Sequence, residues 1–169
     1  FNNCSGKHAG MLALAKYLEV DKAGYVEKSH AVQQYILKYI KGLIDVEKLP
    51  LELDGCSVPT PFMTLESIAK LYQILANSKM DELKKVFDVM SRYPEVIGGT
   101  NNFDSIFIEA LKGRGITKIG AESTHASATP PIAFVPPGPV VAITTPIFPF
   151  NFADATAIIA AAASCLAQI

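Results

Sequence analysis

The sequence lacks most features that would tie it to nucleic acid, a membrane or an oxidising compartment. Its formal net charge is −1, so it has no excess of the basic residues that phosphate binding requires. Its longest apolar stretch, Ala155 to Ile169, is too short and too rich in alanine to predict a membrane span. It holds only three cysteines, an odd, low count that does not indicate a disulfide framework. We therefore expect a cytoplasmic protein whose reduced thiols are available for metal binding or catalysis.

What is present is a globular composition with an unusual tail. The chain has 169 residues, of which 50% are hydrophobic and 18% charged, enough for one domain with its own core. After Ser123 only Asp154 is charged, and most of the prolines lie in that segment. One explanation is a buried pair of strands with a covered helix. The chain also opens at Phe1 without an initiator methionine, so we expect a missing upstream segment.

Apolar residues spaced three and four apart predict five helices ahead of the tail. The third follows Thr64, a candidate N-cap, and the fourth ends before Pro94. The fifth is closed by Gly113 and Gly115. The predicted ranges are about 5–18, 31–43, 65–75, 83–90 and 103–111.

The pattern then changes to β-rich runs, a turn and a last helix. The runs are Gly115–Ala121, Ile132–Val135 and Val140–Thr144, with Pro136-Pro137-Gly138 as a turn. Helix propensity predicts a terminal helix over Ala153–Gln168. The order predicts an α+β fold. We expect a single partial domain over residues 1–169, mainly helical over 1–112, with antiparallel strands and a C-terminal helix over 113–169.

The first candidate site is Cys4 with Lys7. A thiolate binds zinc well, and the start of a helix acidifies a cysteine. Lys7 lies three residues on and can stand beside Cys4, although a lysine must lose its proton before it binds a metal. The plain alternative is a buried cysteine followed by a solvated lysine. Cys4 and His8, four residues apart, could also form a nucleophile and its base.

The second candidate lies in the loop Asp54–Pro61, which glycine and two prolines make rigid. Cys56 could be a second thiolate ligand, and Asp54 could orient a substrate amine. The plain alternative is a turn in which Asp54 bonds its own backbone. Ser67 and Lys70 match S-x-x-K, a serine–lysine pattern, but they lie within an amphipathic helix, which favours an ordinary helical role.

The third candidate is Lys118. Lys118-Ile119-Gly120 is close to the K-T-G of penicillin-recognising enzymes, which lies on a strand at the edge of the active site. There the lysine would supply positive charge and the glycine would let substrate approach the backbone. The plain alternative is an exposed lysine on a strand.

Four blocks of sequence together resemble the asparaginase II-like family, whose L-asparaginases are related in fold to serine β-lactamases and glutaminases. The blocks are Asn2–Met11, Asp54–Thr60, Gly98–Thr100 with Phe103-Asp104, and Thr117–Glu122. They occur in the family's order and at similar intervals. The resemblance covers about residues 2–122, the C-terminal half of a longer catalytic domain, and little after it.

The resemblance implies a function and a set of site residues. Cys4, Lys7 and Cys56 would bind one zinc ion per chain together with a water molecule. Asp54 and His8 would lie near the metal and the substrate, with Asp54 also in a catalytic role. Lys118 would be the active-site lysine paired with a serine. That serine and its S-x-x-K lysine would lie upstream, so Ser67 and Lys70 do not inherit these roles, and this chain alone would be inactive.

The reaction implied is hydrolysis of the side-chain amide of L-asparagine to L-aspartate and ammonia through an acyl-enzyme. One rival is a glutaminase or a β-lactam hydrolase on the same fold. Another is a non-catalytic binding fragment. An upstream Ser-x-x-Lys would separate the enzymes from the binding protein. The partner expected is the small-molecule substrate, with neither nucleic acid nor membrane, and a homodimer is the default assembly.

Overall fold

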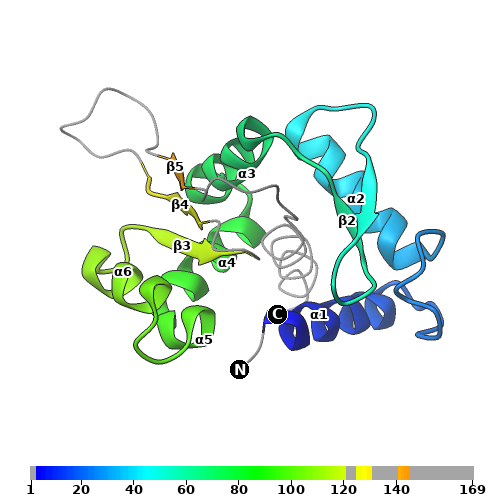
Figure 1. Ribbon diagram of the computed structural model, residues 1–169, viewed down its shortest axis with the longest axis horizontal. Helices are drawn as coiled ribbons and strands as arrows, with labels where there is room; N and C mark the ends of the chain where they lie inside the picture. Colours follow the sequence, from blue (N-terminus) through cyan, green and yellow to red (C-terminus); the bar gives the residue numbers. More distant parts are fainter. Residues whose placement is uncertain (1–2, 121–124, 131–140, 145–169) are drawn as a thin grey trace. The chain divides into compact units, whose positions relative to one another are not determined.

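The computed structural model describes residues 3–120, 125–130 and 141–144 (Figure 1). Over these residues the fold is α+β, with six helices and two small antiparallel sheets, which confirms the predicted class. The chain forms two compact units, and the boundary falls between Met63 and Thr64. The single partial domain over 1–169 stays a prediction.

The first unit is built on two helices, α1 (Asn3–Tyr17) and α2 (Ala31–Ile44). Both agree closely with the predicted ranges. They contact each other, and each contributes apolar side chains to the core, namely Met11, Leu14, Ala15, Val32, Ile36, Ile40 and Ile44. Asp45 ends α2 in the left-handed conformation, with φ 60°, where an aspartate is tolerated better than most residues.

The first unit also contains a hairpin of β1 (Leu51–Leu53) and β2 (Pro59–Pro61). Phe62 N–H donates to Pro50 at 2.8 Å, and Asp54 N–H donates to Val58 at 3.0 Å. Because hydrogen-bonded pairs alternate along an antiparallel ladder, Pro59 and Pro61 fall at positions that need no N–H. The hairpin was not predicted, since two prolines are more typical of a loop.

The second unit opens with four helices, α3 (Leu65–Asn77), α4 (Asp81–Arg92), α5 (Pro94–Gly98) and α6 (Phe103–Leu111). Thr64 caps α3 by accepting the Ser67 N–H at 3.1 Å, as predicted. The predicted apolar faces of α3 and α4 are buried, through Ile68, Leu71, Tyr72, Leu75, Leu83, Val86, Phe87 and Met90. Helix α4 ends before Pro94, but Pro94 then begins α5, which was not predicted.

A three-stranded antiparallel sheet completes the second unit. It has the order β3 (Ile116–Ile119), β4 (His125–Ala128) and β5 (Val141–Thr144). Strands β3 and β5 confirm two predicted runs, whereas β4 was not predicted. Ile119 pairs with His125, and Lys118 pairs with Ala126. The predicted strand Ile132–Val135 and the predicted helix Ala153–Gln168 lie outside the described residues.

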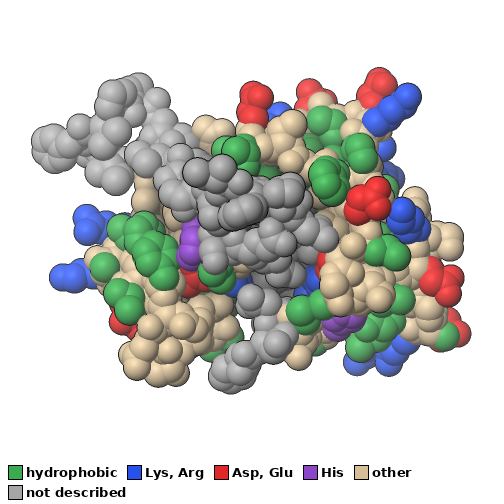
Figure 2. Space-filling model, viewed as in Figure 1, with side chains coloured by type: hydrophobic (Ala, Val, Ile, Leu, Met, Phe, Trp, Pro, Cys, Tyr) green, Lys and Arg blue, Asp and Glu red, His purple; other side chains and the backbone are tan. Residues whose placement is uncertain are grey.

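The described surface shows no gathering of one charge on the face drawn in Figure 2, where acidic and basic side chains are interspersed. This agrees with the net charge of −1. Within the described ranges, every helix is too short or too polar to cross a membrane.

Candidate functional site

The predicted site residues gather in two places. Cys4, Lys7, Asp54 and Cys56 meet in the first unit, and we call them the thiol–lysine cluster. Lys118 lies in the second unit with Asp104 and His125, and we call these three the Asp104 cluster. The named residues of each cluster all belong to the same unit.

Asp54 shapes the loop that joins β1 to β2. Its Oδ1 accepts the backbone N–H of Cys56 at 2.7 Å and that of Val58 at 3.0 Å. Its own carbonyl accepts the Ser57 N–H at 3.0 Å, and Ser57 takes a left-handed φ of 64°. This is the turn that the plain alternative predicted, and it fixes where the Cys56 backbone lies.

Lys7 reaches the same carboxylate from α1. Its amine pairs with Asp54 Oδ2, and the two side chains are 1% and 5% exposed. Burial on its own would raise the pKa of Asp54. The hydrogen bond from Lys7 and the two backbone N–H groups outweigh burial and lower this pKa below its ordinary 3.8. The carboxylate of Asp54 is therefore ionised at neutral pH, and because Lys7 is buried the alternative of a solvated Lys7 is wrong.

The two cysteines meet beside this pair. The Cys56 thiol donates to the Cys4 sulfur, with the two sulfur atoms 2.8 Å apart. The hydrogen bond to Cys4 and burial raise the pKa of the Cys56 thiol to about 11. Without a metal, Cys56 is therefore a protonated thiol at neutral pH.

The donor chemistry of the thiol–lysine cluster fits zinc. In the part of the chain that the structure describes, no three or more His, Cys, Asp and Glu side chains are grouped to hold a metal. The predicted ligand set has two thiols and an amine, and the structure brings these donors together around Asp54. Zinc keeps each sulfur at about 2.3 Å in a tetrahedron, so binding would part the two sulfurs. The zinc ion stays a prediction.

His8 is held by a different neighbour. Its Nδ1 lies 2.6 Å from the Tyr25 hydroxyl, and the two rings meet edge to face. The carbonyl of Tyr25 in turn accepts the Gln33 amide at 2.7 Å. The ring of His8 thus contacts Tyr25, and the thiol of Cys4 contacts Cys56. Neither of these contacts joins Cys4 to His8 as a nucleophile and its base. The substrate-binding role of His8 stays a prediction.

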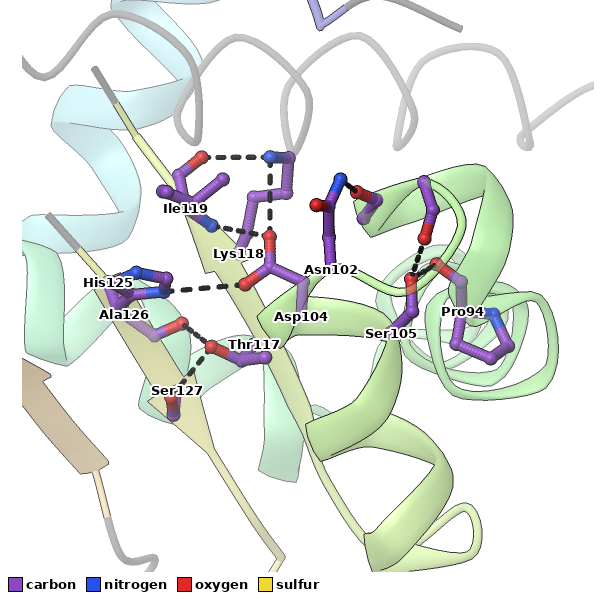
Figure 3. Close-up of polar contacts among 12 residues, drawn as sticks. Pro94, Asn102, Asp104, Ser105, Thr117, Lys118, Ile119, His125, Ala126 and Ser127 are labelled. Carbon is purple, nitrogen blue, oxygen red and sulfur yellow. Dashed lines mark hydrogen bonds and ion pairs between the residues drawn. The ribbon is translucent and has the colours of Figure 1, made fainter. Parts of the chain in front are cut away.

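Lys118 is buried on β3, at 3% exposed, so the alternative of an exposed strand lysine is wrong. Its amine donates to the Ile119 carbonyl at 2.8 Å and lies 3.6 Å from Asp104 Oδ2 (Figure 3). The same Oδ2 accepts the Ile119 N–H at 2.8 Å. Asp104, in the first turn of α6, thus ties that helix to β3 and places a negative charge beside the lysine.

The Gly98-Gly99 turn sets the position of Asp104. A Cβ on Gly98 would lie 2.7 Å from both the Asp104 Cβ and the Ser105 nitrogen, so only glycine fits. Ser105 Oγ donates to the carbonyls of Pro94 and Gly99, and Asn102 donates to the carbonyl of Gly98 (Figure 3). The glycine block that carried part of the resemblance therefore has a structural purpose, which is close packing against the start of α6.

His125 was not singled out by the sequence, and Asp104 was quoted without a role. His125 Nδ1 lies 3.4 Å from Asp104 Oδ1, and the His125 ring meets that of Phe103 edge to face. One signal was available for Asp104, because it lies four residues before Ile108 on the same helix face, and a carboxylate on a buried face must find partners. The partner on β4 could not be found, because that strand was not predicted.

Ser67 and Lys70 lie on α3, as the helical alternative predicted. Ser67 takes part in the helix cap, where its N–H and its hydroxyl both contact the Thr64 hydroxyl. A cap explains this serine without any catalytic role.

Comparison with known proteins adds one finding. A family described as L-asparaginase II matches residues 1–142. The matched span contains the thiol–lysine cluster and the Asp104 cluster, and it ends within β5. No curated protein matches the chain.

Proposed function

Because the chain belongs to the L-asparaginase II family, we propose that it contributes to hydrolysis of the side-chain amide of L-asparagine to L-aspartate and ammonia. Membership indicates an amidohydrolase with a small-molecule substrate. The observation that supports the finer proposal is the burial of Lys118 on β3, beside the carboxylate of Asp104. A cytoplasmic location and a homodimer stay predictions.

In the proposed reaction a serine upstream of this chain attacks the amide carbon. Ammonia leaves, and water then hydrolyses the acyl-enzyme to release aspartate. Negative charge develops on the carbonyl oxygen of the amide in the first attack and of the acyl-enzyme ester in the second, and a fixed cation in a buried site stabilises that charge more than water does. Lys118 is the cation that we assign to this task, with the upstream lysine as the base.

In the same proposal Asp54 and His8 face the substrate. The lowered pKa of Asp54 keeps its carboxylate ionised at neutral pH, and an anion there would attract the α-ammonium group of asparagine. Asp54 would also act in catalysis by keeping Lys7 and the Cys56 loop in place. His8, fixed by Tyr25, would offer a polar edge to the substrate.

Activity assays on the complete gene product test the proposal. We would measure ammonia release from L-asparagine and L-glutamine, and ring opening of a cephalosporin. We expect turnover of asparagine, and Lys118→Met should lower kcat about 10²- to 10³-fold. Lys84→Met is the matched control, because Lys84 is an exposed lysine of the same unit, paired with Asp81.

Each other result selects a rival. Turnover of glutamine or of the cephalosporin, with no turnover of asparagine, would identify a different enzyme on this fold. Absence of all three activities in a folded protein would indicate a binding protein. Circular dichroism of each variant separates loss of activity from loss of fold.

We further propose that Cys4, Lys7 and Cys56 hold one zinc ion. Zinc bound there would polarise a substrate carbonyl or the pocket around it. Lys7 would bind as a neutral amine, and its remaining N–H groups could keep the hydrogen bond to Asp54.

Metal analysis tests the zinc proposal directly. Protein purified with zinc should hold one equivalent by mass spectrometry of the metal. Cys4→Ser and Cys56→Ser should each lose it, while Cys165→Ser, outside the proposed ligand set, should keep it. Metal-free wild-type protein after zinc loading would show that the proposal is wrong.

A further inference from the structure

The carboxylate of Asp104 lies between two different side chains. Oδ2 accepts the Ile119 N–H at 2.8 Å and lies 3.6 Å from the Lys118 amine. Oδ1 lies 3.4 Å from His125 Nδ1 (Figure 3). The side chain of Asp104 is only 1% exposed, so these contacts, rather than water, must offset the cost of burying its charge.

The carboxylate oxygen that faces His125 has no hydrogen-bond partner in the described part of the chain. Asp104 Oδ1 and His125 Nδ1 are both buried and have no hydrogen bond within the described residues. Two unsatisfied polar atoms facing each other are rare in folded proteins and call for an explanation. A proton on His125 Nδ1 directed at Oδ1, with a small closing movement, would satisfy both atoms.

We propose that Asp104 is a positioning residue that holds the Lys118 amine with one oxygen and the His125 ring with the other, which makes His125 a further member of this site. The inference rests on the proposed function for its catalytic meaning. A buried lysine held by a fixed carboxylate keeps one orientation toward the substrate, and orientation of a catalytic group is a large part of rate enhancement. His125 is half-buried, with its side chain 19% exposed.

The arrangement also selects the form of the His125 ring. In a neutral imidazole one nitrogen donates and the other accepts. With Nδ1–H directed at Asp104, Nε2 becomes an acceptor, suited to the amino or amide N–H groups of an asparagine-like substrate. One more titratable group lies close, Tyr72 on α3, whose pKa is raised by burial and by the negative charge of Asp104, so Tyr72 stays neutral.

Replacing Asp104 with asparagine gives a sharp test. Lys118 and the Ile119 N–H both donate toward the Oδ2 position, so the amide oxygen of Asn should lie there. Its NH₂ would then face His125 Nδ1 and make that nitrogen an acceptor. We therefore expect the proton to move from Nδ1 in the wild type to Nε2 in Asp104→Asn.

Long-range ¹H–¹⁵N NMR of the complete gene product, recorded where the ¹⁵N shifts of the ring are those of a neutral imidazole, reads this tautomer. The His125 signals are those lost in His125→Asn. The same tautomer in both proteins would overturn the proposal. If Asp104→Asn does not fold, the wild type decides alone: Nδ1–H supports the proposal and Nε2–H overturns it. Asp81→Asn, in an exposed pair with Lys84, should leave the His125 signals unchanged.

Kinetics complete the test. We expect Asp104→Asn to lower kcat about 10- to 100-fold with a much smaller change in KM, and Asp81→Asn to change neither. A tautomer switch without loss of kcat would also overturn the positioning role. If the wild type does not hydrolyse asparagine, the proposed function fails, while the NMR result still shows whether Asp104 orients His125.

Discussion

In the part of the chain that the structure describes, each unit has a buried lysine–aspartate pair, and the two pairs are built differently. Asp54 uses one oxygen for two backbone N–H groups and the other for Lys7. Asp104 accepts one backbone N–H, lies 3.6 Å from its lysine and has one oxygen with no hydrogen bond among the residues that the structure describes. Lys7 projects from a helix and shares its cluster with two thiols, whereas Lys118 projects from a strand and shares its carboxylate with a histidine.

The comparison separates two uses of a buried charge. A carboxylate whose contacts are all short fixes the chain around it, so the Asp54 pair should contribute strongly to stability, and its proposed role at the site depends on the Cys56 loop that it holds in place. The contacts of Asp104 with Lys118 and His125 are longer, so its carboxylate can adjust to the positions of these two side chains. The Asp104 pair should therefore contribute mainly to the chemistry of Lys118, and the next three predictions test this division.

The largest effect is expected for Lys7→Met. It removes the partner of a buried carboxylate, and breaking such a pair costs about 3–5 kcal/mol of unfolding free energy. Urea unfolding of metal-free protein at neutral pH measures the loss. Lys84→Met removes an exposed lysine with the same change in side chain and should cost well under 1 kcal/mol. Equal costs for the two variants would show that the Lys7 pair is not structural.

Asp54→Asn should lower the unfolding free energy by less, about 1.5–3 kcal/mol at neutral pH, because the side-chain oxygen of asparagine can still accept a backbone N–H. The cost should also depend on pH. The pKa of Asp54 is lowered in the folded protein from its ordinary 3.8, so its contribution is complete above that value and is lost as the pH falls through the lower folded pKa. The stability gap between wild type and variant should narrow below about pH 4.

Unfolding by urea at a series of pH values checks this dependence. Asp81→Asn, at a carboxylate 84% exposed, should show a small gap at every pH. A gap for Asp54→Asn that widens on acidification would contradict the assignment of an ionic pair.

The smallest effect is expected for two glycine-to-alanine variants, whose changes in unfolding free energy should have opposite signs. Gly98→Ala places a Cβ against the start of α6, and overpacking of this kind costs about 1–3 kcal/mol. Gly42 lies in α2 with nothing near the position of its Cβ, so Gly42→Ala should stabilise by about 0.5–1 kcal/mol. Thermal unfolding of both variants measures the contrast, and two shifts of the same sign would contradict it.

Gly98→Ala also bears on the comparison itself. If Asp104 is positioned through the glycine turn, the variant should lower kcat more than its loss of stability explains. Unchanged kcat in folded Gly98→Ala would mean that Asp104 tolerates movement, and it would weaken the division between the two pairs.

Long amphipathic segments could be predicted from sequence, and short or proline-bearing ones could not. The apolar positions of α3 and α4 repeat over at least two turns, and every one predicted is buried. By contrast, α5 has five residues and β4 has four, too few to display a period. The β1–β2 hairpin was missed because its prolines resemble those of a loop.

The site was predictable where its residues are close along the chain or share a block with the family. Cys4, Lys7, Asp54 and Cys56 were expected together, and they meet in one unit. The contacts of Lys118 with Asp104 and of Asp104 with His125 join α6, β3 and β4. These contacts depend on strand register and on the packing of a helix against a sheet, which residue spacing does not specify.

The prolines of β2 have a consequence for self-association. In an antiparallel pair, residues at the non-hydrogen-bonded positions direct their N–H and C=O groups away from the partner strand. At Pro59 and Pro61 that side offers carbonyls but no N–H groups, so an unrelated strand cannot form a regular ladder along it. Pro59 and Pro61 are themselves buried, so this restriction matters when the strand is uncovered, as during folding, where it would limit edge-to-edge aggregation.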